Sequence, residues 1–396
     1  MSTHNLLGQL SGLHDMMTQL VESQTEADCY QSFHPDLAPL AWYFGYAMYR
    51  ETLWVREIIQ GDSDMTERVR AIFHVPEPGD EQWRKLPPKD HLLNWALELQ
   101  DENLTRLANP AMLPDHPLIQ EQRLLPIIVQ ELARIYEQML VVVNQRQLRQ
   151  IELYTVQTPL TGQTPGVDYT GASQGHYRIG AKGDSAAFDN ELPTQIVDLS
   201  SFNIDRHPTS NSHYLAFMEA GGYEDKTLWS EQGWAWQTER PKRPHYWRKD
   251  SAGHWYAIGL NGPFDLIADE PVVGVSYYEA GAYANWVSNL SEEQKGAVLQ
   301  HEYQWEAAIR TKVIQNFGRV WEWCSNPFKP YTGYIHSPYQ QERTGDFSDD
   351  RFCLRGASMH TQRSLRRISL RNRAAPSQNY LFAGIRLVYP PTETEE

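Results

Sequence analysis

The chain has 396 residues, a formal net charge of −15 at neutral pH, 41% apolar residues and 21% charged residues. This length is too great for one ordinary core and predicts two domains, and the composition is that of a globular protein rather than a disordered one. The acidic net charge argues against nucleic acid as a general partner, because binding to its phosphate backbone needs an extended basic face.

The cysteine content and the N-terminal segment bear on the compartment. Three cysteines with no CxxC spacing do not make a disulfide framework, and they fit a reducing environment. The first 20 residues show no basic start followed by an apolar run, so no secretion signal is predicted. No stretch approaches the roughly 18 apolar residues of a membrane span. We therefore expect a cytoplasmic protein that does not act at a membrane.

Four stretches in the first part of the chain carry apolar residues at helical spacing. They are residues 6–24, 37–61, 89–109 and 117–153. Gly61 is a natural stop for the second stretch, and Asp90 is the expected N-cap of the third. Four amphipathic helices joined by modest connections predict a four-helix bundle, which we assign to residues 1–154.

The character of the sequence changes after this region. Residues 155–175 are rich in Gly, Pro, Thr and Ser, which predicts a linker or an irregular loop. From residue 176 to residue 396, short β-prone segments alternate with turn-rich loops, and two short helices are expected near residues 211–222 and 276–289. This pattern predicts an α+β domain with a large share of loops.

Basic residues are concentrated in two segments of the second domain. These are TERPKRPHYWRK (residues 238–249) and QRSLRRISLRNR (residues 362–373). Arginines in such loops commonly hydrogen-bond to loop carbonyls and to neighbouring carboxylates. The alternative is a pocket for a carboxylate or a phosphate, which the planar fork of arginine suits.

Seven motifs follow one another in the second domain. They are AFDNELP (187–193), NSHYLAFMEAGGYEDKTLWSEQGWAWQ (211–237), EPVVGVSYYEAGAYANW (270–286), LQHEYQWEAAI (299–309), FGRVWEWCSNPFKPYTGY (317–334), LRGASMH (354–360) and RNRAAPSQNYLFAGIRL (371–387). In this order they resemble the formylglycine-generating-enzyme-like domain, which has a C-type-lectin-like fold. A fold with so many loops needs buried tryptophans and arginine–carbonyl bonds to fix them.

With the helical region included, the chain resembles the sulfoxide synthases of ergothioneine- and ovothiol-type biosynthesis. In that family a DinB-like four-helix bundle precedes this C-type-lectin-like domain. The resemblance implies a mononuclear iron between the domains, held by three histidines of the bundle. The iron activates oxygen to join a thiol to a histidine-derived imidazole as a sulfoxide. Three neutral imidazoles suit Fe(II) and leave coordination positions open.

The positions that match the three iron ligands carry no histidine in this chain. They are Tyr46 on the second helical stretch, and Glu131 and Ile135 on the fourth, where a spacing of four puts both on one face. No histidine occurs between His116 and His176, so a shifted register supplies none. We therefore expect no metal site and no cofactor in this chain.

The resemblance also points to residues of the second domain. Tyr331 and Tyr334 match a region that supplies active-site tyrosines in the family, and they are equally suited to pinning their loop. The substrate-pocket candidates are Trp321, His360, Arg371, Asn372, Ala374 and Gln378. Among these, Ala374 and Gln378 stand where the ergothioneine branch has an acidic and a basic residue that help to hold its substrates.

Three functions follow from these observations. The first is a diverged sulfoxide-synthase homologue without iron chemistry, acting through its interdomain cleft as a binding module or partner subunit. Its candidate partners are a paralogous enzyme subunit, a small thiol or amino-acid-like ligand, and a second copy of the chain. The second is an active C–S bond-forming oxidoreductase with an altered site built from Tyr46, Glu131, Glu137 and His360. The third is a lectin-like recognition protein using the loop at residues 371–380.

Overall fold

The computed structural model describes residues 3–74, 79–150, 153–337, 339 and 347–391. The chain divides into two units. Unit 1 comprises Met1–Gln150 with the short segments Asp184–Ala186 and Thr361–Leu365. Unit 2 comprises Ile151–Gly183, Ala187–His360 and Arg366–Glu396. The described residues confirm the predicted order of an N-terminal helical region followed by an α+β domain.

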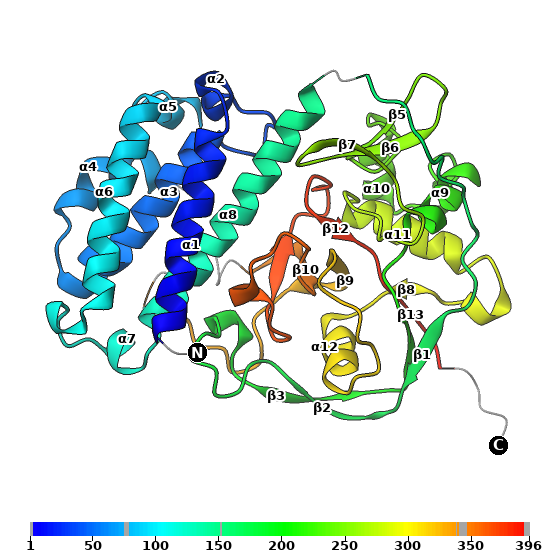
Figure 1. Cartoon of the computed structure of the whole chain (residues 1–396). Helices are drawn as coiled ribbons and strands as arrows, with labels where there is room; N and C mark the ends of the chain where they lie inside the picture. Colours follow the sequence, from blue (N-terminus) through cyan, green and yellow to red (C-terminus); the bar gives the residue numbers. More distant parts are fainter. Residues whose placement is uncertain (1–2, 75–78, 151–152, 338, 340–346, 392–396) are drawn as a thin grey trace. The chain divides into compact units, whose positions relative to one another are not determined.

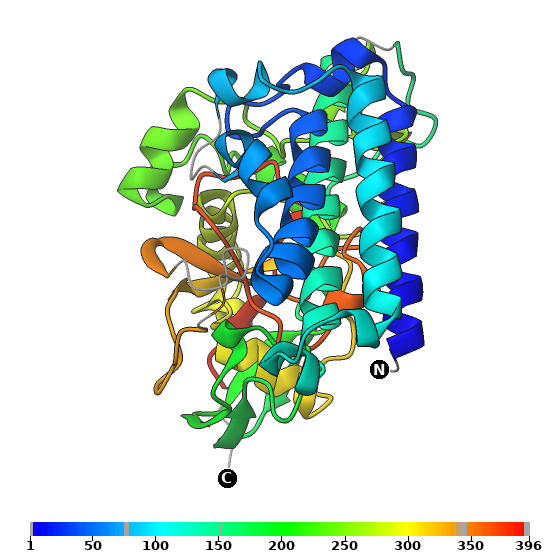
Figure 2. The ribbon, with the colours of Figure 1, turned by 90° about the vertical axis from the view of Figure 1, so that its left-hand side faces the viewer.

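Unit 1 is helical (Figures 1 and 2). Its elements are α1 (Thr3–Glu22), α2 (Glu26–Tyr30), α3 (Leu40–Thr52), the π-helical turn η1 (Leu53–Ile58), α4 (Asp64–Phe73), α5 (Asp80–Trp83), α6 (Lys89–Ala108), η2 (Pro110–Met112), α7 (Pro117–Gln120), α8 (Leu124–Arg149) and η6 (Arg363–Leu365). The four long stretches predicted as helical correspond to α1, α3 with η1, α6, and α7 with α8. Helices α1, α3, α6 and α8 pack on one another.

The ends of two helices show how local sequence sets their length. Gly61 stops the second stretch as predicted, because it adopts the left-handed φ of 73° that favours glycine. The predicted N-cap of α6 is wrong. Pro88 occupies the cap position without a side-chain hydrogen bond, and Asp90 lies inside the first turn. The first helical amide, that of Lys89, instead donates to Glu26 Oε1 of α2 at 3.3 Å, so a side chain from another helix supplies the acceptor.

An aromatic cluster fills the core between α3 and its neighbours. Trp42, Tyr49, Leu53 and Phe73 are buried in it. Gly45 makes the packing possible, because a Cβ atom at this position would lie 2.5 Å from the Cζ atom of Phe73. A small residue on α3 is therefore what lets the Phe73 ring approach the helix.

Unit 2 combines small sheets with short helices. One sheet has the order β1 (Tyr169–Ala172), β4 (Phe202–Asp205), β13 (Leu387–Tyr389), β8 (Val298–Leu299). A second has the order β11 (Asn372–Ala374), β10 (Ser348–Arg355), β9 (Trp321–Phe328), β12 (Ala383–Gly384), with β12 parallel to β9. The others pair β2 (Gly175–Ile179) with β3 (Gln195–Leu199), and β6 (Trp255–Gly259) with β5 (Trp247–Lys249) and β7 (Gly262–Asp265).

The helices of unit 2 are more numerous than the two that were expected. They are α9 (Asn211–Glu219), α10 (Glu231–Thr238), α11 (Tyr277–Val287) and α12 (Glu302–Arg310), with the short turns η3 (Asp189–Glu191), η4 (Lys226–Leu228) and η5 (Glu292–Gln294). Helices α9 and α11 match the prediction. Helices α10 and α12 were missed because they are short and rich in tryptophan and tyrosine, which suggests strand as readily as helix.

The stretch expected to be a linker forms structure in unit 2. Residues 169–172 make strand β1, which pairs with β4. Further upstream, the Asp265 carboxylate accepts hydrogen bonds from the Tyr154 hydroxyl at 2.8 Å and from the Thr158 amide at 2.7 Å. The Asp265 carboxylate, more than 100 residues further along the chain, thus holds the start of this stretch. Local sequence does not reveal such a contact.

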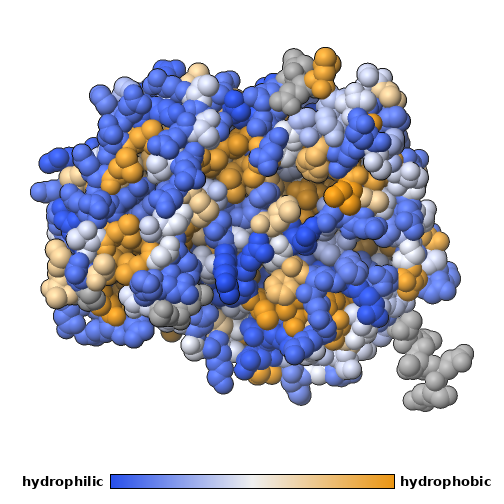
Figure 3. All heavy atoms as spheres, in the orientation of Figure 1, coloured by the Kyte–Doolittle hydropathy of each residue, from blue (hydrophilic) through white to orange (hydrophobic). Residues whose placement is uncertain are grey.

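One face of the molecule is seen in the space-filling view. Figure 3 shows hydrophilic residues over most of the face drawn, with apolar side chains between them. No helix in the described part of the chain is long and apolar enough to cross a membrane. The expectation of a cytoplasmic location stays a prediction.

Candidate functional site

The three positions that the family resemblance matches to iron ligands lie on two helices of unit 1. Tyr46 is on α3, whereas Glu131 and Ile135 are on α8, and these helices pack directly against each other. The spacing of four on α8 puts Glu131 and Ile135 on the same face.

The Glu131 carboxylate is fully buried and is held by donors from α3 and η1. Arg50 Nε donates to Oε2 at 3.0 Å, and Arg50 Nη2 donates to Oε1 at 3.1 Å. Trp54 Nε1 donates to Oε2 at 2.8 Å. Arg50 is only 4% exposed, and Glu131 has no exposed surface. Both oxygens of Glu131 are therefore occupied by charge-assisted hydrogen bonds inside the core.

The other two positions are packed as parts of a core. The Tyr46 ring stacks on Trp42, with ring centroids 4.8 Å apart and planes at 13°. Ile135 is 3% exposed and carries no donor atom for a metal. Tyr46 thus contributes its aromatic face to the cluster around α3, and Ile135 contributes apolar volume.

The iron that the family resemblance implies does not fit these residues. A ferrous site needs neutral nitrogen or free oxygen donors directed at one point. Here one position is aliphatic, and the only carboxylate is bound by a guanidinium whose positive charge opposes a cation. In the described residues, no three His, Cys, Asp or Glu side chains come together in an arrangement that could hold a metal ion. No reaction step through iron follows from this site.

Arg50 and Trp54 are the residues of this site that the sequence analysis missed. The signal was present, because Tyr46, Arg50 and Trp54 recur at intervals of four on one helical stretch. Arg50 lies one helical turn after Tyr46, and a basic residue there can form an ion pair with an acidic residue at another of the matched positions, such as Glu131. Without the structure, nothing connected Arg50 with Glu131, which lies 81 residues away.

Unit 1 contains a second buried polar pair. His14 Nε2 of α1 and Glu51 Oε2 of α3 are 2.6 Å apart, and the two residues are 3% and 0% exposed. The remaining polar atoms of the pair, His14 Nδ1 and Glu51 Oε1, are buried and have no hydrogen-bond partner in the described residues.

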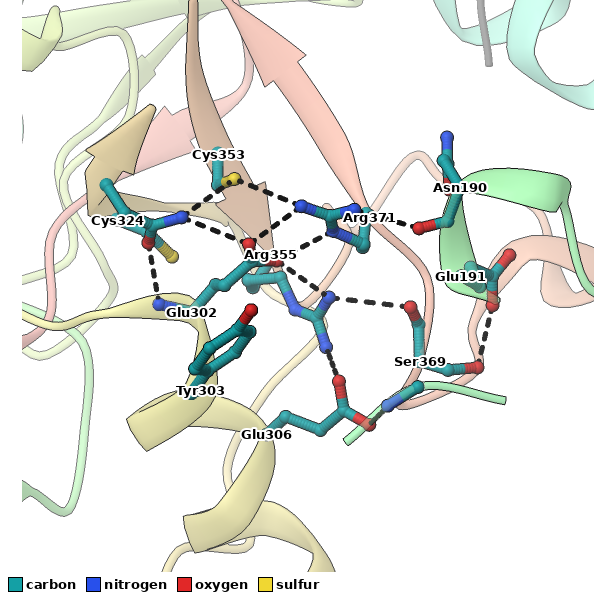
Figure 4. A network of polar contacts seen from close by, with 12 residues as sticks. Asn190, Glu191, Glu302, Tyr303, Glu306, Cys324, Cys353, Arg355, Ser369 and Arg371 are labelled. Atoms are coloured by element: carbon teal, nitrogen blue, oxygen red, sulfur yellow. Dashed lines mark hydrogen bonds and ion pairs between the residues drawn. The ribbon is translucent and has the colours of Figure 1, made fainter. Parts of the chain in front are cut away.

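Unit 2 contains a buried network of arginines and carboxylates (Figure 4). Glu302, at the start of α12, accepts from Arg371 Nε and Nη2, each at 2.8 Å. Arg355 pairs with Glu306 one turn further along α12. Burial alone would raise the pKa of Glu302, but the guanidiniums of Arg371 and Arg355 outweigh it and lower the pKa below its usual value.

Arg371, expected near a substrate, belongs to this network. It is 2% exposed, and it also donates to the carbonyl oxygens of Asn190 at 2.8 Å and Lys329 at 2.7 Å. Tyr331 lies against it, with the guanidinium carbon 4.1 Å from the ring centroid. Burial raises the pKa of Tyr331 well above its ordinary value, so its hydroxyl stays protonated at neutral pH.

Tyr334 lies in a different polar group. Its hydroxyl donates to Asp189 Oδ2 at 2.9 Å and is 3.0 Å from His336 Nδ1. Burial, followed by the nearby Asp189 charge, raises the pKa of Tyr334. The two hydroxyls therefore differ: that of Tyr334 donates to Asp189, whereas that of Tyr331 is buried and has no hydrogen-bond partner in the described residues.

The remaining pocket candidates are distributed over the second sheet and its loops. Trp321 is 5% exposed at the start of β9, Asn372 and Ala374 lie in β11, and Ala374 is 1% exposed. Gln378 accepts from the Ala375 amide at 3.0 Å and so closes its own loop. The His360 ring packs on Phe382 at 4.4 Å, and burial lowers the pKa of its imidazole.

The cysteines of unit 2 have the environment of core residues. Cys324 and Cys353 are both 0% exposed, and burial raises the pKa of both thiols. A thiol that remains protonated and covered is a poor nucleophile.

Glu279 gives unit 2 an unusual pH dependence. This residue of α11 is 1% exposed, accepts from the Tyr223 hydroxyl at 2.6 Å, and has its pKa raised by burial to about 7. In the unfolded chain it titrates near 4.5, so its contribution to stability is complete below that pH and is lost as the pH rises toward 7. The rise in the pKa of Glu279 from 4.5 to about 7 corresponds to about 3 kcal/mol of stability.

Between about pH 5 and 8, the wild type should lose free energy of unfolding relative to Glu279→Gln, as measured by urea titrations of both proteins. Parallel pH profiles would contradict this prediction.

Comparisons with known proteins agree with the two-part fold. Residues 170–317 match the model of the sulfatase-modifying factor enzyme 1-like domain. The chain is 29% identical over 256 residues to a hercynine oxygenase of Mycobacterium tuberculosis, covering 53% of this chain and 58% of that protein. It is 25% identical to a hercynine oxygenase of Mycolicibacterium smegmatis, covering 97% of this chain and 98% of that protein. The first of these alignments therefore spans little more than half of the relative, whereas the second spans nearly all of it.

Among solved structures, PvdO from Pseudomonas aeruginosa is similar with a TM-score of 0.42 and 16% identity, covering 60% of this chain and all of that chain. The fold and the matched domain define a protein with a helical region and an α+β domain of the sulfatase-modifying factor type. In more particular terms, the chain is a homologue of the hercynine oxygenases.

Proposed function

We propose that this chain is a non-catalytic homologue of the hercynine oxygenases, in which a buried ion pair replaces the iron site of the bundle. The observation that carries the proposal is the Glu131 carboxylate, bound through both oxygens by Arg50 and by the Trp54 indole. A buried carboxylate that already accepts three hydrogen bonds, two of them from a cationic guanidinium, is a poor ligand for a metal cation.

The charge of Arg50 strengthens this argument. A ferrous ion beside Glu131 would lie close to the guanidinium, and removing Arg50 from the carboxylate would leave a buried cation without its counter-ion. The alternative altered metal site would draw on Tyr46, Glu131, Glu137 and His360. In unit 1, the Glu137 carboxylate already accepts the Thr361 hydroxyl at 2.8 Å. The ion pair therefore favours loss of iron chemistry over a rebuilt centre.

The role that remains is that of a binding module or a partner subunit. Buried ion pairs, Arg50–Glu131 in unit 1 and Arg371–Glu302 in unit 2, hold each unit as a rigid scaffold, which is what a binding protein needs. The proposed ligands are a histidine derivative or a small thiol, and the proposed protein partners are a paralogous enzyme subunit or a second copy of this chain.

Oxygen uptake tests the catalytic half of the proposal. Protein incubated anaerobically with Fe(II) is mixed with hercynine, a thiol and oxygen, and a hercynine oxygenase is assayed beside it as the positive control. We expect uptake equal to that of a protein-free blank. Uptake that depends on both hercynine and this chain would refute the proposal. Calorimetric titration of hercynine into the metal-free protein then tests the binding half, with saturable heat as the expected result.

A further inference from the structure

The turn between α10 and β5 brings two arginines together. The Trp247 amide donates to the Pro244 carbonyl at 3.1 Å, which closes a tight turn. Arg243 and Arg248 stand immediately before and after it. Arg243 Nη1 donates to the Trp247 carbonyl at 2.7 Å, and Arg248 Nη1 donates to the same oxygen at 2.8 Å. Because both nitrogens contact one oxygen, they are at most about 5.5 Å apart.

These two guanidiniums lack the counter-charge that the other buried arginines of unit 2 possess. Arg355 and Arg371 each bind a buried glutamate. In the described part of the chain, Arg243 and Arg248 bind backbone carbonyls alone, since the second bond of Arg248 Nη1 goes to the His245 carbonyl at 2.9 Å. Each is partly buried. Two like charges held this close and partly removed from water are costly unless an anion joins them.

The surroundings add to the positive potential. Burial, followed by the charge of the neighbouring Arg243, lowers the pKa of Arg248 to about 10. Lys249 lies over the Trp255 ring, with Nζ 4.6 Å from its centroid. Asp250, the nearest acidic residue in sequence, accepts from the backbone amides of Val156 and His254 instead.

We propose that Arg243 and Arg248 form a binding site for a small oxyanion, a phosphate or a carboxylate, at the turn before β5. Each guanidinium uses Nη1 for the backbone, which leaves Nε and Nη2 for the edge of an anion with two oxygens. If these arginines served only to hold the turn, one guanidinium on the Trp247 carbonyl would be enough. Two guanidiniums on the same oxygen therefore favour a binding role. The site lies wholly in unit 2 and does not depend on the loss of iron in unit 1.

Calorimetric titration of the full chain tests this site, with inorganic phosphate as one probe and glutamate as the other, in chloride buffer of matched ionic strength. We expect one saturable site for at least one probe, and the probe that binds more tightly identifies the source of the anion. Arg243→Gln and Arg248→Gln should each weaken binding about tenfold or more, the loss of one charge-assisted contact. Lys242→Gln is the matched control, because this exposed lysine pairs with Glu224 at 3.0 Å, and it should stay within about twofold of the wild type.

Two results would overturn the proposal. The first is no saturable binding of either probe by the wild type, a measurement that needs no variant to fold. The second is an equal loss of anion affinity in Lys242→Gln and Arg248→Gln, which would show that binding depends only on the net charge of the protein. Circular dichroism melts without added anion accompany each titration. Arg248→Gln should melt no lower than the wild type, because it removes a like-charge repulsion, whereas a turn-pinning role alone predicts a lower melting temperature and no response to phosphate.

Discussion

Replacement of Arg50 by methionine should destabilise unit 1 by about 3–5 kcal/mol, the usual cost of leaving a buried charge without its partner. The change removes both guanidinium bonds to Glu131, while the Trp54 indole still donates to the carboxylate. Hydrogen exchange measured by mass spectrometry on α3 and α8 gives a local readout. Protection in both helices should fall together, because the pair joins them.

Two further variants define the cause of this loss. In Arg50→Met/Glu131→Gln the buried charge is gone and the amide oxygen still accepts from Trp54, so at least half of the lost stability should return. Arg106→Met is the matched control, since Arg106 pairs with Glu102 on the exposed side of α6 at 3.1 Å, and an exposed pair contributes at most about 1 kcal/mol. If Arg50→Met costs no more than Arg106→Met, the buried pair is not what holds α3 to α8.

Arg371→Met should have the largest effect in unit 2, also about 3–5 kcal/mol. Arg371 neutralises the buried Glu302 through two bonds and ties down the carbonyls of Asn190 and Lys329. Loss of amide protection in α12, which Glu302 begins, would report the effect locally.

The conservative change separates charge from geometry at this position. Arg371→Lys keeps the positive charge but not the planar fork, so it should recover less than half of the loss. Arg319→Met, at an exposed pair with Glu270, provides the control. Full stability in Arg371→Lys would show that the charge alone matters, and full stability in Arg371→Met would contradict the structural role of the network.

The sequence predicted the architecture well where its signals were local. Apolar spacing identified the long helices of unit 1, and the alternation of β-prone segments with turn-rich loops identified the second part of the chain as an α+β domain. Helices α10 and α12 were missed because short aromatic segments take their conformation from tertiary packing. Strand β1 was missed because its pairing with β4 is a contact about 30 residues away in sequence.

The candidate site was predictable only in part. That Tyr46, Glu131 and Ile135 match iron-ligand positions rests on the family resemblance and stays a prediction, while the sequence itself shows no histidine at any of the three. The sequence did not show why Glu131 can be completely buried, because its partners Arg50 and Trp54 come from another helical stretch. Similarly, the basic segment at residues 238–249 left two interpretations open, and only the shared carbonyl of Trp247 shows how close Arg243 and Arg248 lie.

The measurement that tests the central claim most directly is metal content by elemental mass spectrometry, on protein purified without a histidine tag and incubated anaerobically with Fe(II). If the Arg50–Glu131 pair has replaced the iron site, less than roughly a tenth of an equivalent of any transition metal should remain after desalting. Near one equivalent of iron, lost in Tyr46→Ala or Glu131→Ala, would contradict the account and show that these residues bind metal after all.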